Sequence, residues 1–322
     1  MLNRRETLAG IAILAAIRPA AAQAFPARAV TMVVPYPAGG PTDAIGRLIA
    51  DEMTRTLGQS VVVENKGGAA GSVGTRGVAK ADPDGHTIVF GNNQTHGNNL
   101  FLVKDLGYHP VTDFAPLAGI GAFQHAFVVR KDLPAQSVAE LIALAKQEPG
   151  KLNYGSTGNG SGSHLAMELF KTLTGTEMQH IPFRGAADLV REIAAGRIDV
   201  SLSTLPSVLG QIRGGAMRCL AVASPARVPQ LPDVPTLEEA GVKGAEAESW
   251  TGFFAPSKTP EPIIAVLSKA VLDAVRKDNM RAAIDNLGFT IELRDSTAFR
   301  PYHAAEIKKW GDIIKAANVP VE

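Results

Sequence analysis

One stretch in the middle of the chain combines glycines and small hydroxyl side chains in a way that suits anion binding. Residues 155–163 are only glycine, serine, threonine and asparagine. The residues just before them (152–155) read as a short strand, and the leucines that follow recur every four positions, as on a helix ending at Gly175. A strand, a glycine-rich loop and a helix N-terminus in that order present unpaired backbone N–H groups. The pattern predicts an anion site.

A second stretch near the start of the chain repeats this order. Residues 30–34 read as a buried strand because they are β-branched, few in number and bounded by Pro35. The loop 35–43 holds two adjacent glycines, which let backbone approach a ligand, and Thr42 or Asp43 is expected to cap the next helix. Two such loops, far apart in the sequence, indicate a site built between two lobes.

Other chemistries find little support in the residue spacing. The seven histidines show no metal-ligand pattern, so no metal or other cofactor is expected. Ser161 and His164 are three residues apart, which leaves a hydrolase open as a less favoured alternative, but no G-x-S-x-G motif surrounds the serine. Cys219 is the only cysteine and is expected to be a small core residue. We therefore predict no catalytic residues.

The N-terminus predicts export from the cytoplasm. Arg4 and Arg5 precede an apolar run over residues 8–17, and residues 22–24 offer an A-x-A cleavage site. The run is too short to span a bilayer. We expect a signal peptide over residues 1–24, cleaved near Ala24 to release a periplasmic protein; the general and the twin-arginine export routes both stay open.

The remaining composition describes an ordinary globular protein. Without residues 1–24, Lys and Arg fall from 32 to 29 and Asp and Glu from 31 to 30, which leaves a net charge near −1. Such a chain has no basic surface to bind nucleic acid. At 322 residues it suits two domains.

Predicted strands and helices alternate along most of the chain, which is typical of α/β folds with parallel sheets. The expected strands are 30–34, 61–63, 87–90, 126–129, 152–155, 179–181, 200–202, 219–222 and 251–254. The expected helices are 45–57, 73–79, 137–147, 165–174, 187–195, 207–213, 262–276, 279–287 and 298–317, with a polar loop at 91–99. If the chain were divided into two consecutive domains, the last three helices would have no strands to cover. We therefore expect a discontinuous first lobe (25–124 plus 249–322), a second lobe (125–248) and two crossings that form a hinge.

The ordered set of short motifs resembles the Bug-type solute receptors of the tripartite tricarboxylate transporter system. The matching stretches are 35–43, 65–71, 82–85, 158–161 with His164 and Leu165, 180–182, 221–222, 231–236, 239–241 and Trp250. They cover nearly all of the chain after residue 24, in family order and with family-like spacing. The resemblance implies a type II periplasmic binding protein: two α/β lobes with a hinge and a cleft between them.

In this family two loops hold one ligand carboxylate through amides and hydroxyls. The resemblance implies ligand-binding roles for Tyr36, Ala38, Gly39, Gly40, Thr42, Asp43, Thr95, His96, Ser156, Thr157, Gly160, Ser161, His164, Arg184, Ser203 and Thr204. Ser203 and Thr204 stand where the family commonly has an Asp-Asn pair, and their neutrality disfavours an amino-acid ligand with a distal ammonium.

The resemblance implies a receptor, not an enzyme. It would capture a small carboxylate, such as a dicarboxylate or an aromatic acid, and dock transiently on membrane transporter subunits. We expect a monomer. A sensing module for a membrane signalling protein is the alternative that stays open, because it would use the same cleft.

Overall fold

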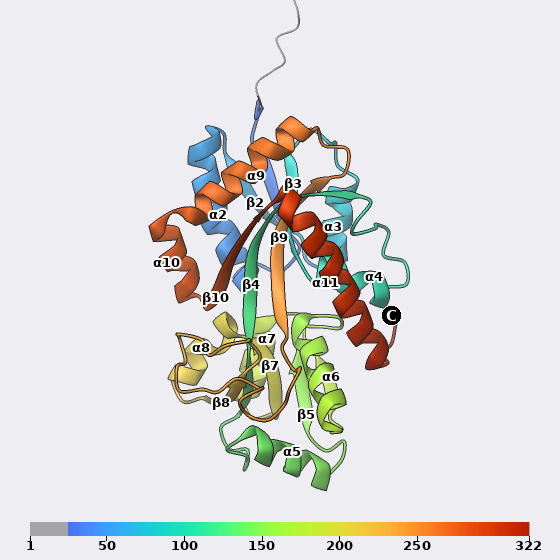
Figure 1. The fold of residues 1–322 in the computed structure, drawn as a ribbon, viewed down its shortest axis with the longest axis vertical. Helices are drawn as coiled ribbons and strands as arrows, with labels where there is room; N and C mark the ends of the chain where they lie inside the picture. The colour runs from blue at the N-terminus through green and yellow to red at the C-terminus, as the bar shows by residue number, and fades with distance from the viewer. Residues whose placement is uncertain (1–24, 322) are drawn as a thin grey trace, which may run out of the picture.

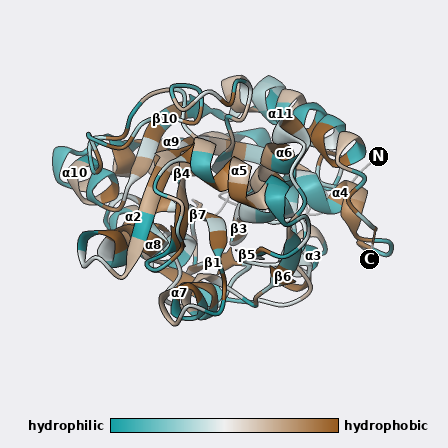
Figure 2. Ribbon diagram, turned by 90° about the horizontal axis from the view of Figure 1, so that it is seen from below, coloured by the Kyte–Doolittle hydropathy of each residue, from teal (hydrophilic) through white to brown (hydrophobic). Residues whose placement is uncertain are grey.

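The computed structural model describes residues 25–321, so the predicted signal peptide lies outside the described residues. The described chain forms two lobes, drawn one above the other in Figure 1, with long strands running between them. Each lobe is a sheet with helices packed on its faces. The helices are amphipathic, and Figure 2 shows hydrophobic and hydrophilic residues together on α5 (Val138–Gln147).

The first lobe is built on three parallel strands. These are β1 (Val30–Val34), β2 (Val61–Asn65) and β3 (Thr87–Asn92), with β1 between the other two. The helical segments that follow them are α2 (Pro41–Leu57), α3 (Ser72–Ala79), the π-helical η1 (Gln94–Asn98) and α4 (Asn99–Leu102). Ile45, Ile49 and Met53 of α2 are fully buried against the sheet, since their spacing of four puts them on one face.

The second lobe repeats this arrangement of strands followed by helices. Its strands are β5 (Asn153–Ser156), β6 (Gln179–Pro182), β7 (Val200–Thr204) and β8 (Met217–Val222). β5 pairs in parallel with β6 and β7. The helices of this lobe, besides α5, are α6 (Gly162–Thr174), α7 (Ala186–Ala194) and α8 (Leu205–Arg213).

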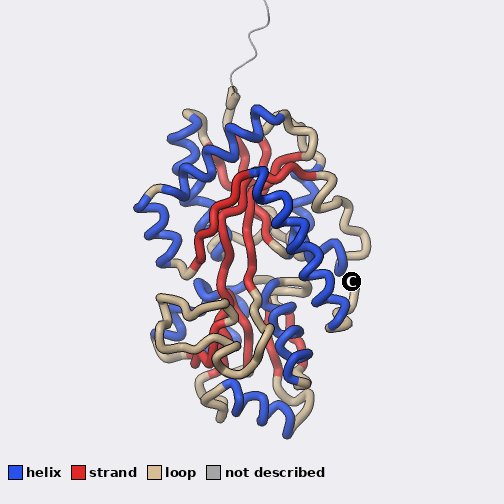
Figure 3. The backbone as a smooth tube through the Cα atoms, in the orientation of Figure 1, coloured by secondary structure: helices blue, strands red, loops and turns tan. Residues whose placement is uncertain are grey.

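Two long strands connect the lobes, as the tube in Figure 3 shows. The first part of β4 (Phe114–Arg130) pairs with β9 (Glu248–Pro256) and β10 (Phe289–Asp295), all antiparallel. From His125 onward the same strand pairs with β7 and β8. The change of partner at His125 supports lobe limits near residues 124 and 249, which stay a proposal.

The C-terminal helices cover the first lobe and reach the second. They are α9 (Glu261–Arg276), α10 (Asp278–Asn286) and α11 (Ser296–Ala316). Phe299 near the start of α11 packs in an aromatic cluster of the first lobe, whereas Trp310 and Ile314 pack into the core of the second. α11 therefore belongs to both lobes, although the sequence assigned it to the first alone.

Several local expectations were wrong. The sheets are mixed and not purely parallel, because β4, β8, β9 and β10 pair antiparallel. β4 begins at Phe114 and not near residue 126, and β10 was missed. The predicted loop 91–99 is largely helical from Gln94. The cap of α2 is Gly40 instead of Thr42 or Asp43, since Pro41 occupies the first helical position that proline favours.

Candidate functional site

The predicted ligand-binding residues lie at or just after the carboxyl ends of five parallel strands. Residues 36–43 follow β1, residues 95 and 96 follow β3, and 156–164 end β5 and follow it. Arg184 follows β6, and Ser203 and Thr204 end β7. In open α/β sheets ligands bind beyond this edge of the strands. The order of strands and loops therefore places these residues where a ligand site is expected.

In the first lobe, the carboxylate of Asp43 holds its own loop together. It is almost fully buried and accepts hydrogen bonds from the Gly39 amide (2.8 Å), from Arg47 Nε (3.1 Å) and from Asn65 Nδ2 (3.0 Å). Burial would raise the pKa of Asp43, but the hydrogen bonds from Arg47, Gly39 and Asn65 outweigh it and hold the pKa below its ordinary value. An ionised Asp43 fixes the shape of the loop and is not itself a group that attracts an anion.

Tyr36 extends this loop toward the segment after β3. Its hydroxyl lies 2.8 Å from Asn92 Oδ1 and 3.1 Å from Gln94 Oε1, so it can donate to either oxygen. Burial raises the pKa of the phenol, which therefore stays protonated. Tyr36 is a neutral donor.

In the second lobe, hydroxyl groups and a helix N-terminus meet in the glycine-serine loop. Ser161 caps α6, because its Oγ accepts from the His164 amide at 3.2 Å. Ser163 Oγ lies 3.0 Å from Ser161 Oγ, 3.2 Å from Thr157 Oγ1, and accepts from the Thr157 amide. Three hydroxyls thus gather at the first turn of α6.

Two stacked imidazoles form hydrogen bonds with this loop. The rings of His164 and His180 lie 4.0 Å apart and nearly parallel. His164 Nδ1 accepts from the Gly160 amide at 3.1 Å, and His180 Nε2 lies 2.6 Å from Ser156 Oγ. Burial lowers the pKa of His164 to about 4 and that of His180 to about 3, with smaller contributions from Lys171 and His164 respectively. Both rings are neutral at pH 7.

This arrangement speaks against the alternative of a Ser161–His164 hydrolase. A nucleophilic serine needs its hydroxyl hydrogen-bonded to the imidazole that takes the proton. Here Ser161 Oγ receives the backbone N–H of His164, while the ring nitrogen Nδ1 receives the Gly160 amide. The pair caps a helix and orders a loop.

The two lobes touch through side chains that the sequence analysis did not single out. Gln94 Nε2 donates to the carbonyl of Asn159 at 2.9 Å, and Asn98 Nδ2 donates to the carbonyl of Gly160 at 2.8 Å. Since Gln94 also contacts Tyr36, one side chain connects the loop after β1 to the loop after β5. The two predicted loops therefore converge. The polar composition of residues 91–99 was the available signal for Gln94 and Asn98.

Some predicted residues have structural contacts instead. The ring of His96 has no exposed surface and stacks on Phe254 at 3.9 Å, inside the first lobe; its Nδ1 lies 3.0 Å from Thr95 Oγ1. Burial lowers the pKa of His96 well below its ordinary value. His96 therefore serves as aromatic packing here, which corrects the expectation that its side chain lines the site.

Three further predicted residues lie around the glycine-serine loop. Ser203 is buried with its Oγ 2.8 Å from Ser201 Oγ, and Thr204 Oγ1 lies 3.0 Å from Ser207 Oγ. Arg184 is exposed and makes no hydrogen bond or ion pair with residues 25–321. It follows Phe183, whose amide donates to the Ser156 carbonyl at 2.9 Å, so its backbone lies beside the loop.

Many backbone N–H groups that were expected to bind an anion already donate hydrogen bonds to other groups of the protein. The N–H groups of Gly39, Thr157, Gly160 and Ser161 donate to Asp43, Ser163, His164 and Gly158, respectively. The first-turn amides of α2 (Thr42, Asp43) and of α6 (Gly162, Ser163) have no partner within their helices. These helix ends, with Ala38 and Gly40 exposed or half-buried beside α2, are the remaining main-chain donors of the predicted set.

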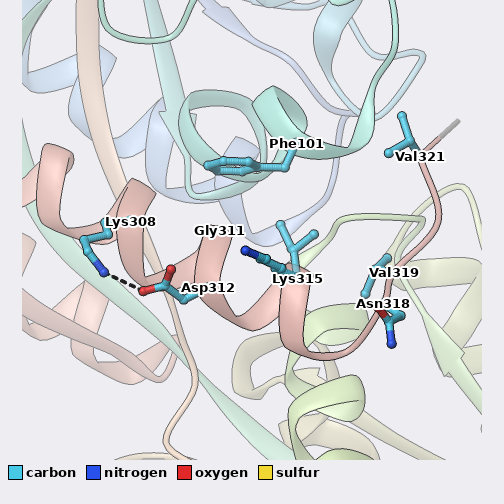
Figure 4. Close-up of a pocket in the computed structure, with 9 residues that line it drawn as sticks. Phe101, Lys308, Gly311, Asp312, Lys315, Asn318, Val319 and Val321 are labelled. Carbon is cyan, nitrogen blue, oxygen red and sulfur yellow. Dashed lines mark hydrogen bonds and ion pairs between the residues drawn. The ribbon is translucent and has the colours of Figure 1, made fainter.

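A cavity of about 560 Å³ lies elsewhere, between α4 and the C-terminal end of α11 (Figure 4). Its lining includes Phe101, Ile314 and Lys315, and none of the predicted ligand-binding residues. Within residues 25–321, no group of three metal-ligating side chains gathers. In the same part of the chain, every helix is too short or too polar to cross a membrane.

Comparisons with known proteins identify the family of this chain. A family profile described as "Tripartite tricarboxylate transporter family receptor" matches residues 45–319. Protein BugT of Bordetella pertussis is 32% identical over 326 residues, which cover 100% of both chains. The solved structure of R. palustris Rpa4515 with adipate is 36% identical with a TM-score of 0.89, covering 92% of this chain and 100% of that one. MatC (Rpa3494) from Rhodopseudomonas palustris, with bound malate, is 35% identical with a TM-score of 0.85, covering 90% and 100%.

Proposed function

Because this chain belongs to the Bug-type receptors of the tripartite tricarboxylate transporter family, we propose that it captures a small carboxylate between its two lobes outside the cytoplasm. The family and the two-lobed periplasmic binding protein fold are those that the sequence motifs implied. Proteins of this family are solute receptors. The observation that carries the proposal is the meeting of the loops after β1 and β5, joined through Gln94.

Neutral donors suit the capture and release of an anion. Hydrogen bonds to a charged group contribute about 1.5–3 kcal/mol each, and a helix N-terminus adds roughly 0.3–1 kcal/mol. Four or five such bonds contribute roughly 6–15 kcal/mol, a range that includes the ~8 kcal/mol of micromolar binding before ordering costs are subtracted. The first-turn amides of α2 and α6 and the hydroxyls of Ser161 and Ser163 supply the donors, whereas the one proton of the Tyr36 phenol is already shared by Asn92 and Gln94. No buried lysine is required.

The charges around the predicted site favour a ligand without a cationic group. Asp43 is neutralised by Arg47, and Ser203 and Thr204 are uncharged. Arg184 is the one predicted residue that carries a positive charge without a partner among residues 25–321. Adipate and malate, bound by two relatives, are dicarboxylates. We place the ligand in the same chemical class.

The partners and the location follow from the same premise. As a family receptor, the protein would deliver its ligand to membrane subunits of a tripartite tricarboxylate transporter. Export would depend on the predicted signal peptide at residues 1–24. A single chain supplies both loops of the site, so a monomer is sufficient for binding.

Calorimetry with matched ligands tests the proposal. Adipate and malate would each be compared with the corresponding neutral diamide, which keeps the shape and removes the charge. We expect binding of at least one dicarboxylate and at least tenfold weaker binding of its diamide, because amide and hydroxyl donors bond a charged oxygen more strongly. Binding that is equal or tighter for the diamides would refute a carboxylate site.

A further inference from the structure

One face of the short helical segment after β3 is turned toward the second lobe. Gln94, Asn98 and Leu102 are spaced four residues apart across η1 and α4, so they lie on the same side of the segment. All three are at least 96% buried. The segment belongs to the first lobe by its position after β3, yet Leu102 packs in the core cluster of the second lobe.

The contacts of this face are concentrated on two consecutive peptide units. Gln94 and Asn98 bind the carbonyls of Asn159 and Gly160, and the Cδ1 of Leu102 lies close to Gly160, where a Cβ would approach it to 2.9 Å. Gly160 has a φ of +69°, a conformation that glycine adopts without strain. The loop therefore presents its carbonyls to the first lobe at a position where a side chain would interfere.

These bonds involve carbonyl oxygens, and an anionic ligand would seek N–H donors instead. The bonds from Gln94 and Asn98 occupy carbonyls of the loop, so they take no N–H donor of the loop away from a ligand. Asn98 has no other hydrogen bond through its side chain, since its Oδ1 is buried without a partner. If Asn98 no longer donates, the carbonyl of the buried Gly160 loses this hydrogen bond, and the full desolvation cost of the carbonyl then lowers stability.

We propose that Gln94, Asn98 and Leu102 form a docking face that holds the glycine-serine loop against the first lobe and thereby sets ligand affinity without touching the ligand. The inference rests on the proposed receptor function for its effect on affinity. Its effect on lobe closure is independent of any ligand. A receptor that is partly closed before binding needs less ligand energy to close, so these positioning residues raise affinity by shifting that population.

Asn98 and its neighbour Asn99 provide a matched pair of substitutions. Asn99 Nδ2 donates to the Ala70 carbonyl at 2.9 Å, a bond of the same kind that stays within the first lobe. Asn98→Asp and Asn99→Asp are isosteric, and each turns a donor into an anionic acceptor facing a carbonyl. Both variants should lose similar stability, but only Asn98→Asp should separate the lobes.

The test measures closure and affinity separately. Spin labels at Val62 and Leu173, which are 52% and 45% exposed and lie in different lobes, would report the inter-lobe distance by pulsed electron resonance in a Cys219→Ser background. Ligand-free Asn98→Asp should gain a population at longer distance, while Asn99→Asp keeps the distribution of the parent. Adipate should dissociate about tenfold faster from Asn98→Asp than from Asn99→Asp.

Two results would overturn the proposal. One is an unchanged distance distribution for ligand-free Asn98→Asp, and the other is an equal shift for both variants. If the parent protein binds no adipate, the distance measurement alone decides, so a wrong ligand class and a wrong docking face give different outcomes.

Discussion

At the scale of single residues, the loops after β1 and β5 are built from groups that are neutral or neutralised, and among the predicted site residues only Arg184 carries a charge without a partner in residues 25–321. Asp43 is ionised but surrounded by Gly39, Arg47 and Asn65, and the imidazoles of His164 and His180 carry no charge at pH 7. Burial is the largest cause of the lowered pKa of both histidines. The loop that they support therefore depends on conditions in which those rings stay neutral.

This dependence predicts a pH effect on stability. The pKa of His164 is 6.5 in the unfolded chain and about 4 in the folded protein, so between these values the unfolded chain binds more protons. The stabilisation by neutral His164 is complete above about pH 6.5 and is lost as the pH falls toward about 4. Urea unfolding at several pH values should show a shallower loss in His164→Gln, by up to ~1.4 kcal/mol per pH unit. Parallel curves for the two proteins would contradict a neutral, buried His164.

The sequence indicated the loops but not the contacts within them. Glycine and hydroxyl-rich stretches are local patterns, so residues 155–163 and 35–43 could be found without an alignment. Two contacts join residues that only the fold brings together. Asp43, at the start of α2, bonds Asn65 at the end of β2, and His164 stacks on His180. His96 illustrates the converse, because a polar residue after a strand end was expected to line the site and instead packs on Phe254.

At the scale of elements, two helices of the second lobe begin with the same chemical device but differ in position. Ser161 caps α6 at the candidate site, and Ser137 caps α5 through the Glu140 amide, away from it. A capping box was predicted here from the sequence, and one of its two bonds is present, from the Glu140 amide to Ser137 Oγ; the Glu140 carboxylate instead accepts from the amide of Gln136, one residue before the cap. Comparison of Ser161 with Ser137 therefore distinguishes the effect of losing a helix cap from an effect on ligand binding.

We predict that Ser161→Ala and Ser137→Ala each lower the free energy of unfolding by about 1 kcal/mol, the usual cost of losing a serine cap. Only Ser161→Ala should also reduce the thermal stabilisation by adipate, because its hydroxyl lies beside that of Ser163 at the first turn of α6. Thermal shift with and without adipate measures both effects. Equal ligand-induced shifts in the two variants would place the site away from α6.

The ends of strands and helices were predictable where a proline or glycine stands at the boundary. β1 was expected at residues 30–34 and found there, and Gly58 and Gly175 end their helices in the left-handed conformation. The first part of β4 was missed because it contains Pro116, Gly119 and Gly121, residues that favour turns. In the structure they fall at irregularities of the pairing with β9.

At the scale of the whole molecule, the two lobes are joined by strands and covered by a helix that contacts both. β4 changes partners at His125, whose Nδ1 lies 2.9 Å from the Ala247 carbonyl, and the side chain of the preceding residue, Gln124, donates to Glu248 and Thr290. The division into discontinuous lobes, which stays a proposal, was expected from the count of strands and helices. The double attachment of α11 was not, because its apolar residues fit either core.

The ionised carboxylate of Glu248 lowers stability at this junction, and its replacement gives a test of the hinge. Burial raises the pKa of Glu248 above its ordinary value, with the Gln124 hydrogen bond and Lys309 acting against this and Glu292 and Glu306 adding to it. The folded protein therefore binds the proton more tightly than the unfolded chain, so the ionised form costs stability at neutral pH and less as the pH falls.

Glu248→Gln keeps the shape of the side chain and an oxygen that accepts from Gln124, and it removes the charge. We expect a higher melting temperature than that of the parent at pH 7 to 8, with the difference shrinking as the pH falls through the raised pKa of Glu248. Since β4 and β9 both cross between the lobes here, relief of this charge acts where the lobes join. Calorimetric melting of both proteins from pH 8 down through the pKa of Glu248 measures the difference. A variant less stable than the parent at pH 8 would mean that the carboxylate is needed at the junction for its charge.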